Sequence, residues 1–391
     1  MNDNNFRISG AEIFIDGQFV KKDISVKGNR IASVDAPGQG TPTLGFDGKG
    51  MKVIPGFFDV HSHGGGGEDF NLCSEEGLHK ILGFYASHGV SSVLATVLTD
   101  TDDVITKQLR MIARAKEAGA VQIAGIHLEG PFLCKDYKGA MPEYLLQKPD
   151  FKSFMGWQEA AGGLIRLITI APELEGAAEF TKQAVDSGCV VSMGHSGADY
   201  RQTMACIDNG AMGITHTMNG MKLIHQHDPG ILTAAFLSNI YCEIICDGRH
   251  LYPEIVELLL KIQGRDRLLG VTDSIMAAGL PDGEYRLGVN DVVVLDGDAK
   301  LKDGGSRAGS TLTMEQGLRN YIGYTRQSLE EALPVYTKNP VEYLNLAGER
   351  GTIEAGKYAD FVLCRIDNGN NIEIVETFSS GKPLLGRVTH Q

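Results

Sequence analysis

The sequence lacks the long apolar runs of a membrane protein. None approaches the roughly 20 residues that a membrane-spanning helix needs, so we expect no membrane association. Cysteines with the paired C-x-x-C spacing are absent, although the chain has seven cysteines in all. The chain opens with the polar segment MNDNNFR, whereas a secreted protein opens with a charged and then apolar signal. We therefore expect a soluble protein of the reducing cytoplasm.

Basic stretches interleaved with aromatic residues are also missing, and the formal net charge is −13 at pH 7. Because such a charge repels phosphate backbones, we expect no nucleic-acid partner. Apolar residues make up 42% of the chain and charged residues 22%, which is typical of a globular protein and excludes a disordered one. The length of 391 residues suits one barrel with a smaller second domain.

Short apolar runs alternate with segments of helix length through the middle of the chain. This rhythm predicts an α/β fold, a TIM-like (β/α)8 barrel of parallel strands whose active site lies at the C-terminal ends of the strands. After the first run, Ser74 is suited to begin a helix and Gly89 to end it, which predicts an outer barrel helix. The eight runs are 53–58, 90–97, 121–128, 164–170, 189–194, 212–216, 241–246 and 267–272.

The two ends of the chain differ from the middle in their sequence pattern: they contain short strand-like runs that end in Asp-Gly or Gly-Asn turns. Chain termini often lie close together. We therefore predict that residues 1–52 and 350–391 form one small β-sandwich domain and that residues 53–349 form the catalytic barrel. Residues 279–310 are predicted to leave the barrel as a hairpin excursion.

Residues that bind metals or transfer protons follow five of the eight runs. A single histidine is more often structural than a ligand, but this repeated placement at strand ends favours a metal site. Nitrogen and oxygen donors of this kind suit zinc, with iron, cobalt or manganese as alternatives. The candidate ligands are His61, His63, Glu129, His195 and His216, and the remaining titratable residue is Asp273.

One or two ions fit this set of donors. Glu129, His195 and His216 suffice for one ion, and a second could lie on His61 and His63 while sharing Glu129. Asp273 could cap a helix, bind metal, or act as a catalytic acid and base. In the last role it takes a proton from metal-bound water, which becomes hydroxide near neutral pH, and delivers it to a leaving amine. The set predicts a metal-dependent hydrolase of amides or esters.

Motifs across nearly the whole chain resemble the N-acetylglucosamine-6-phosphate deacetylases of the amidohydrolase superfamily. A single H-x-H motif is weak evidence, whereas the ordered set is specific. The motifs are Pro55–Gly64 (PGFFDVHSHG), His127–Phe132 (HLEGPF), Gly194–Ser196 (GHS), Thr215–Met221 (THTMNGM), Asp247–His250 (DGRH), Thr272–Gly279 (TDSIMAAG), Ala308–Ser310 (AGS), Asn339–Pro340 (NP) and Gly356–Asp360 (GKYAD).

The resemblance implies metal on Glu129, His195 and His216, a second ion on His61 and His63, and Asp273 as general base and acid. It also implies hydrolysis of the acetamide of an N-acetylhexosamine 6-phosphate, with N-acetylglucosamine 6-phosphate as the first choice, and a homodimer. The implied substrate-side residues are Ala140, Met141, Asn219, Gly220, His227, His250 and Met276.

Two substrate-side residues depart from the family pattern. Met141 stands where the family has a polar side chain, and a thioether cannot donate a hydrogen bond. His227 stands where the family has an arginine, and a histidine is only partly charged near neutral pH. Lys222, His225 and His250 are expected to restore some attraction for phosphate. The alternative substrates are therefore N-acetylgalactosamine 6-phosphate or an unphosphorylated N-acetyl amino sugar.

Three rival functions remain to be weighed. A cyclic-amide hydrolase or a deaminase could use the same barrel, but no strand ends in the lysine that bridges the ions of many such barrels, and Glu129 takes that position. A non-catalytic scaffold would be expected to have lost ligands, and this chain keeps all five candidates and Asp273.

Overall fold

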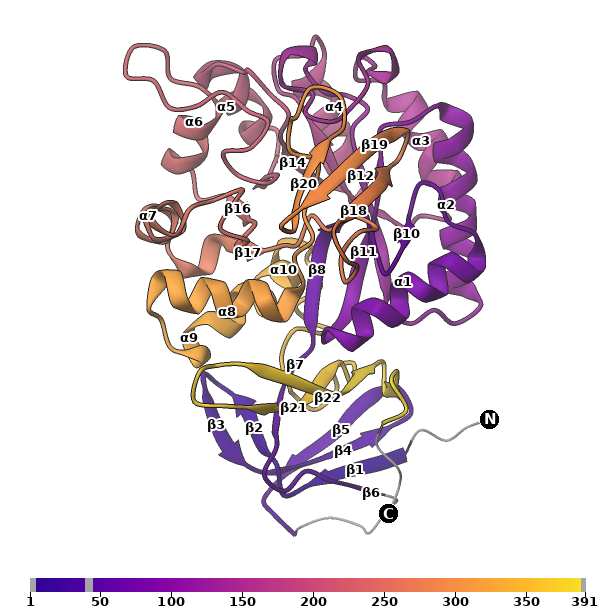
Figure 1. Cartoon of the computed structure of the whole chain (residues 1–391), viewed down its shortest axis with the longest axis vertical. Helices are drawn as coiled ribbons and strands as arrows, with labels where there is room; N and C mark the ends of the chain where they lie inside the picture. Colours follow the sequence, from indigo (N-terminus) through magenta and orange to yellow (C-terminus); the bar gives the residue numbers. More distant parts are fainter. Residues whose placement is uncertain (1–4, 39–44, 388–391) are drawn as a thin grey trace.

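The computed structural model describes residues 5–38 and 45–387. Its larger part is a barrel of parallel strands, and a smaller β domain lies at one end of it (Figure 1). The strand order in the barrel sheet is β17-β16-β15-β14-β13-β12-β11-β8, which confirms the predicted TIM-like fold. The strands are β8 (Phe57–Ser62), β11 (Val90–Leu98), β12 (Ile123–Glu129), β13 (Ile165–Ile170), β14 (Val190–Met193), β15 (Gly213–Ile214), β16 (Tyr241–Ile244) and β17 (Leu268–Gly270).

Helices form the layer outside these strands (Figure 1). The predicted outer helix is α1: the Ser74 side chain accepts a hydrogen bond from the Gly77 N–H at 3.2 Å, and Leu78, Ile81 and Tyr85 are buried. The α-helices are α1 (Glu75–Ser87), α2 (Asp102–Glu117), α3 (Phe151–Ala160), α4 (Ala177–Asp186), α5 (Tyr200–Asp208), α6 (Ile231–Leu237), α7 (Pro253–Gln263), α8 (Met314–Thr325), α9 (Leu329–Tyr336) and α10 (Lys338–Tyr343). Short 3-10 turns are η1 (Lys135–Tyr137), η2 (Glu143–Leu145) and η3 (Arg265–Arg267).

The predicted first barrel strand, 53–58, was wrong in its bounds. The run is split, because β7 (Lys52–Pro55) belongs to the small β domain and the barrel strand begins only at Phe57. Pro55 has no N–H to donate to a neighbouring strand. Gly56 packs so closely on Ser91 that a Cβ at this position would clash with the Ser91 side chain. As a result His61 lies within β8 rather than after it, and the chain leaves the strand just before His63.

The small β domain brings the two ends of the chain together at the bottom of Figure 1. One sheet has the order β5-β4-β1-β6 and the other β23-β22-β21-β7-β2-β3, so strands from the tail pair with strands from the head. Phe6, Phe361 and Phe378 pack in the core between them. The strands are β1 (Asn5–Ser9), β2 (Glu12–Ile15), β3 (Gln18–Lys21), β4 (Asp23–Lys27), β5 (Arg30–Asp35), β6 (Gly45–Asp47), β21 (Phe361–Ile366), β22 (Ile372–Ser379) and β23 (Lys382–Pro383).

The predicted excursion after the last barrel strand is a three-stranded antiparallel sheet. It consists of β18 (Gly283–Leu287), β19 (Asn290–Leu295) and β20 (Asp298–Leu301), and it lies beside the end of the barrel opposite the small domain (Figure 1). Val292 and Val294 of this sheet pack with Leu98 and Ile275 of the barrel. A two-stranded hairpin of β9 (Gly64–Gly65) and β10 (Glu68–Asp69) follows the first barrel strand.

Backbone hydrogen bonds link the first barrel strand to the segment after the last one. The Asp273 N–H donates to the His61 carbonyl at 2.8 Å, and the His63 N–H donates to the Ser274 carbonyl at 2.7 Å. The two ends of the barrel sheet therefore meet at three candidate site residues. Within the described residues, no helix combines the length and the apolar character needed to cross a membrane.

Candidate metal centre

Four histidine side chains converge on one carboxylate at the mouth of the barrel. Glu129 is the last residue of β12, and its Oε1 lies 3.1 Å from Nε2 of both His195 and His216. The same oxygen lies 3.4 Å from Nε2 of His61, and Oε2 lies 3.3 Å from Nε2 of His63. One carboxylate thus contacts all four rings, which is the arrangement needed to share it between two ions.

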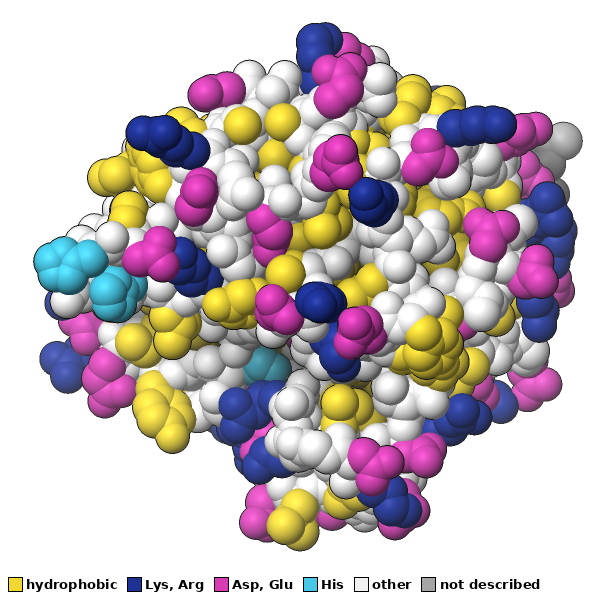
Figure 2. Space-filling view, turned by 90° about the horizontal axis from the view of Figure 1, so that it is seen from above, with side chains coloured by type: hydrophobic (Ala, Val, Ile, Leu, Met, Phe, Trp, Pro, Cys, Tyr) yellow, Lys and Arg dark blue, Asp and Glu magenta, His cyan; other side chains and the backbone are white. Residues whose placement is uncertain are grey.

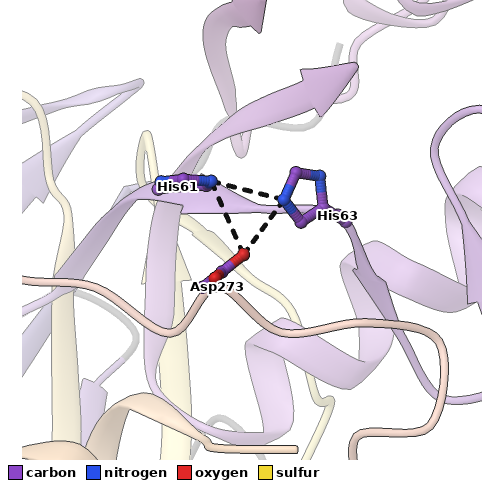
Figure 3. Close-up of side chains that lie close together, drawn as sticks. All are labelled: His61, His63 and Asp273. Carbon is purple, nitrogen blue, oxygen red and sulfur yellow. Dashed lines mark hydrogen bonds and ion pairs between the residues drawn. The ribbon is translucent and has the colours of Figure 1, made fainter. Parts of the chain in front are cut away.

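Asp273 lies beside His61 and His63, and the three side chains point toward one another (Figure 3). Its Oδ1 is 3.0 Å from Nε2 of His63 and 3.5 Å from Nε2 of His61. No helix begins directly after Asp273, so the helix-cap alternative is wrong. Two groups of side chains could therefore each hold a metal ion, with all ligand atoms of a group within 4.8 Å of one another. They are His61, His63 and Asp273, and Glu129, His195 and His216.

A second hydrogen bond fixes the orientation of three of the four rings. In each, Nδ1 faces an oxygen that can only accept, so Nδ1 carries the proton and donates it. A neutral ring then presents a bare lone pair at Nε2. The pairs are His195 with the Tyr137 carbonyl (2.8 Å), His216 with the Asn219 carbonyl (3.1 Å) and His61 with Glu243 Oε2 (2.9 Å).

The Nε2 atoms of two of these rings meet at one carboxylate oxygen. Nε2 of His195 and Nε2 of His216 are 3.0 Å apart, and both face the same oxygen of Glu129. With both rings neutral, three acceptors at such distances need a cation between them. Neighbouring ligands of a tetrahedral zinc ion, with bonds of about 2.0–2.1 Å, lie roughly 3.3 Å apart. The residues present therefore fit a divalent first-row metal ion.

The charges of the buried carboxylates favour the same conclusion. Burial raises the pKa of Glu129, but the neighbouring imidazoles, His61 first among them, hold it well below its usual value. Burial also raises the pKa of Asp273, and His61 and His63 bring it down to about 2. Both carboxylates are thus ionised at neutral pH. Two buried negative charges need compensating positive charge, which protonated imidazoles or a bound divalent cation can supply.

Three of the candidate residues adopt the left-handed backbone conformation, which non-glycine residues rarely do. The φ angles are 47° at His195, 31° at His216 and 50° at Asp273. Each follows a barrel strand within three residues, so the chain turns sharply just after the strand ends. Such strain costs about 1–3 kcal/mol per residue and is concentrated at active sites. This pattern favours a functional role over a structural one.

A cavity of about 370 Å³ opens at the two groups. Met141 is buried in its wall and packs with Leu98 and Leu287, so the thioether fills an apolar contact instead of offering a hydrogen bond. Five of the seven residues predicted on the substrate side line this cavity: Ala140, Met141, Asn219, Gly220 and His250.

The other two predicted substrate residues, His227 and Met276, do not line the cavity. His227 is exposed on the loop before α6, next to the ring of His225. The view onto this end of the molecule shows histidines at its outer edge and another deep in a central hollow (Figure 2). Met276 instead accepts a hydrogen bond at its sulfur from the Arg286 N–H. Within the described part of one chain, the cavity wall therefore lacks both of these predicted side chains.

Comparison with known proteins assigns the chain to a family. The model of the amidohydrolase family matches residues 52–384, which is most of the chain. An N-acetylglucosamine-6-phosphate deacetylase from Lysinibacillus sphaericus is 34% identical over 89% of this chain and 90% of its own length. The chain belongs to the amidohydrolase family. Within it, the chain groups with the N-acetylglucosamine-6-phosphate deacetylases, as the motifs predicted.

Two further relatives of this amidohydrolase bear on its substrate. A structure of the N-acetyl-D-glucosamine-6-phosphate deacetylase from Mycobacterium smegmatis, in complex with N-acetyl-D-glucosamine 6-phosphate, matches with a TM-score of 0.89. It is 30% identical and covers 97% of this chain and 99% of the other. An N-acetylgalactosamine-6-phosphate deacetylase from Escherichia coli O157:H7 is 32% identical over 82% of this chain and 85% of its own length. Relatives of comparable identity thus act on different sugar epimers.

Glu243 is the residue of the amidohydrolase site that sequence reasoning missed. It lies in β16, and its Oε2 accepts hydrogen bonds from His61 Nδ1 and from the His216 N–H, both at 2.9 Å. One buried carboxylate therefore orients the ring of His61 and holds the backbone of His216, a residue of the other metal group. The available signal was a single acidic residue in the apolar run 241–246, which we interpreted only as a strand.

Replacing Glu243 with glutamine should weaken metal binding without emptying the site. Loss of such an outer partner typically costs 10- to 100-fold in metal affinity, and we expect the ion nearest His61 to be lost first. Metal titration of the purified variant beside the wild type, followed by metal analysis, measures this. Equal affinities in the two proteins would exclude a positioning role for Glu243.

Proposed function

We propose that this amidohydrolase hydrolyses the acetamide of N-acetylglucosamine 6-phosphate to acetate and glucosamine 6-phosphate. The observation that carries the proposal is the convergence of four imidazoles and two ionised carboxylates on one cavity. The relatives named above support the choice of substrate. The proposed first ion lies on Glu129, His195 and His216, and a second on His61 and His63 with Glu129 shared.

The chemistry divides between the metal and the chain. A bound divalent ion lowers the pKa of water from 15.7 toward about 7 and polarises a carbonyl oxygen. Asp273 is ionised and lies at the cavity, so it can take the proton of the attacking water. It then delivers that proton to the amide nitrogen as the C–N bond breaks, because an amine must be protonated to leave. Acetate and the free amino sugar are the products.

N-acetylgalactosamine 6-phosphate is the second candidate substrate. The relative from Escherichia coli O157:H7 supports it. The buried thioether of Met141 also leaves this part of the wall without a side-chain donor to select the orientation of one hydroxyl. An unphosphorylated N-acetyl amino sugar is a weaker alternative, since the relatives named above are deacetylases of sugar 6-phosphates.

The finer properties that we propose are zinc as the native ion, a homodimer and a cytoplasmic location. The nitrogen and oxygen donors support zinc. The location is supported by the cysteines, all seven of which are free thiols in the structure, as in a reducing compartment. Family resemblance supports the homodimer.

Acetate release from a panel of compounds tests the proposed function. The metal-analysed protein is given N-acetylglucosamine 6-phosphate, its galactosamine epimer and both unphosphorylated sugars. We expect the highest kcat/KM with the first. A hydantoin, dihydroorotate and an aminopurine serve as negative controls and should give no product. Turnover of a control compound, or of no acetylated sugar, would reject the proposal.

A further inference from the structure

The phosphate of the proposed substrate requires positive charge in the cavity, and of the residues expected to attract it only His250 lines the cavity. His227 and His225 are exposed on the loop before α6, outside the cavity. Lys222 on the same loop pairs with Asp228 at 2.6 Å. Among the described residues that line the cavity, Arg307 is the sole arginine or lysine.

Arg307 is held in one orientation by hydrogen bonds from three of its five N–H groups. Nε and Nη2 donate to the two carboxylate oxygens of Asp298 at 2.9 and 3.3 Å, and Nη1 donates to the Arg249 carbonyl at 3.0 Å. One N–H on each terminal nitrogen is left for a ligand. An arginine fixed in this way loses little conformational entropy when it binds an anion.

The pairing with Asp298 does not cancel the positive charge. Lys300 also contacts Asp298, at 2.9 Å, so two cations share one carboxylate and the group keeps a net charge of one. The side chain of Arg307 is about one-third exposed and thus still open to the cavity. Its guanidinium is therefore charged, oriented and accessible.

A histidine lies beside Arg307 in the cavity wall. The carbonyl that Arg307 holds belongs to Arg249, and the next residue, His250, lines the cavity as well. Nδ1 of His250 is 2.7 Å from Asp247, and no described residue is hydrogen-bonded to its Nε2. The two side chains thus face the cavity from neighbouring positions of its wall, with the two remaining N–H groups of Arg307 and Nε2 of His250 open to a ligand.

We propose that Arg307 binds the phosphate of the substrate, next to His250, as the permanently charged group that His227 cannot provide. This inference rests on the proposed function for the identity of the ligand. Arginine suits phosphate because two parallel N–H groups match two phosphate oxygens. The sequence analysis did not identify Arg307 as a phosphate ligand. Arg307 lies just before the motif Ala308–Ser310 and far along the sequence from the phosphate residues expected from the resemblance.

The test measures ligand affinity separately from turnover. The product glucosamine 6-phosphate and unphosphorylated glucosamine are titrated against wild type, Arg307→Met and Arg307→Lys by calorimetry, and KM and kcat are measured with N-acetylglucosamine 6-phosphate. Lys302→Met is the matched control, because it removes a cation that pairs with Glu284 beside the same three-stranded sheet and does not line the cavity. Thermal midpoints confirm that each variant is folded.

We expect Arg307→Met to raise Kd and KM for the phosphorylated ligands by about 10- to 100-fold, the usual effect of a hydrogen bond to a charged group. The change in kcat should be small, and Arg307→Lys should recover part of the loss. Glucosamine affinity should stay the same, as should all constants of Lys302→Met.

Other outcomes separate the two proposals. Unchanged Kd for glucosamine 6-phosphate in both Arg307 variants would overturn the inference, even if the wild type hydrolyses the substrate as proposed. Equal losses for glucosamine and its phosphate would also overturn it, since they indicate a structural role. Conversely, Arg307-dependent binding of the phosphate by a wild type that releases no acetate would support the inference and reject the proposed function.

Discussion

Asp273→Asn should yield a folded, metal-loaded protein that has lost most of its turnover. Asparagine keeps the shape of aspartate and tolerates the left-handed backbone at this position, where φ is 50°. Its amide cannot accept a proton from water or deliver one to the leaving amine. General acid–base catalysis contributes about 10²- to 10⁴-fold, so we expect kcat to fall by that factor. Acetate release at saturating substrate measures it.

The position of Asp273 makes metal content an essential companion measurement. Its Oδ1 lies 3.0 Å from Nε2 of His63, so the residue could also be a metal ligand. We expect the ion on Glu129, His195 and His216 to remain in the variant. Asp136→Asn, the same change at another carboxylate of the cavity wall, is the control and should leave kcat nearly unaltered. An Asp273→Asn enzyme with full activity would contradict the proton-transfer role.

Glu129→Gln should remove both the metal and the activity. Oε1 of Glu129 faces three imidazoles and Oε2 a fourth, so this change removes the negative charge at the centre of both groups. A metal ion supplies several kcal/mol of catalysis, which corresponds to a loss of about 10³-fold or more in kcat. Removing the metal from the wild type with a chelator should cause the same loss, and added zinc should reverse it.

A matched control separates the metal from general damage. Glu315→Gln changes a half-buried glutamate that pairs with His88 at 2.7 Å, outside the site. It should leave metal content and turnover unaltered. Full metal content in Glu129→Gln would show that Glu129 is not a ligand. Activity that persists after complete chelation of the wild type would show that hydrolysis does not depend on the metal.

The sequence predicted the barrel because strand-length apolar runs alternate with helical segments, and both patterns are local. Seven of the eight predicted strands agree with the structure to within two or three residues at each end. The bounds of the first predicted strand were wrong, because Pro55 and Gly56 divide an apolar run that its hydrophobic pattern alone predicts as one strand. Candidate ligands could be identified because residues that follow parallel strands lie at one end of a barrel wherever they occur along the chain.

The remaining features depend on contacts between distant segments, which no local pattern encodes. Glu243 matters because its carboxylate bonds to the ring of His61 and to the backbone of His216, which lie on two other segments. Arg307 reaches the cavity only because a three-stranded sheet folds back beside the barrel mouth. His227 was expected on the substrate side from the family resemblance, yet its side chain is exposed to solvent. Sequence therefore determined which residues can perform the chemistry, whereas the tertiary structure decided which of them meet, because packing of the whole chain sets those distances.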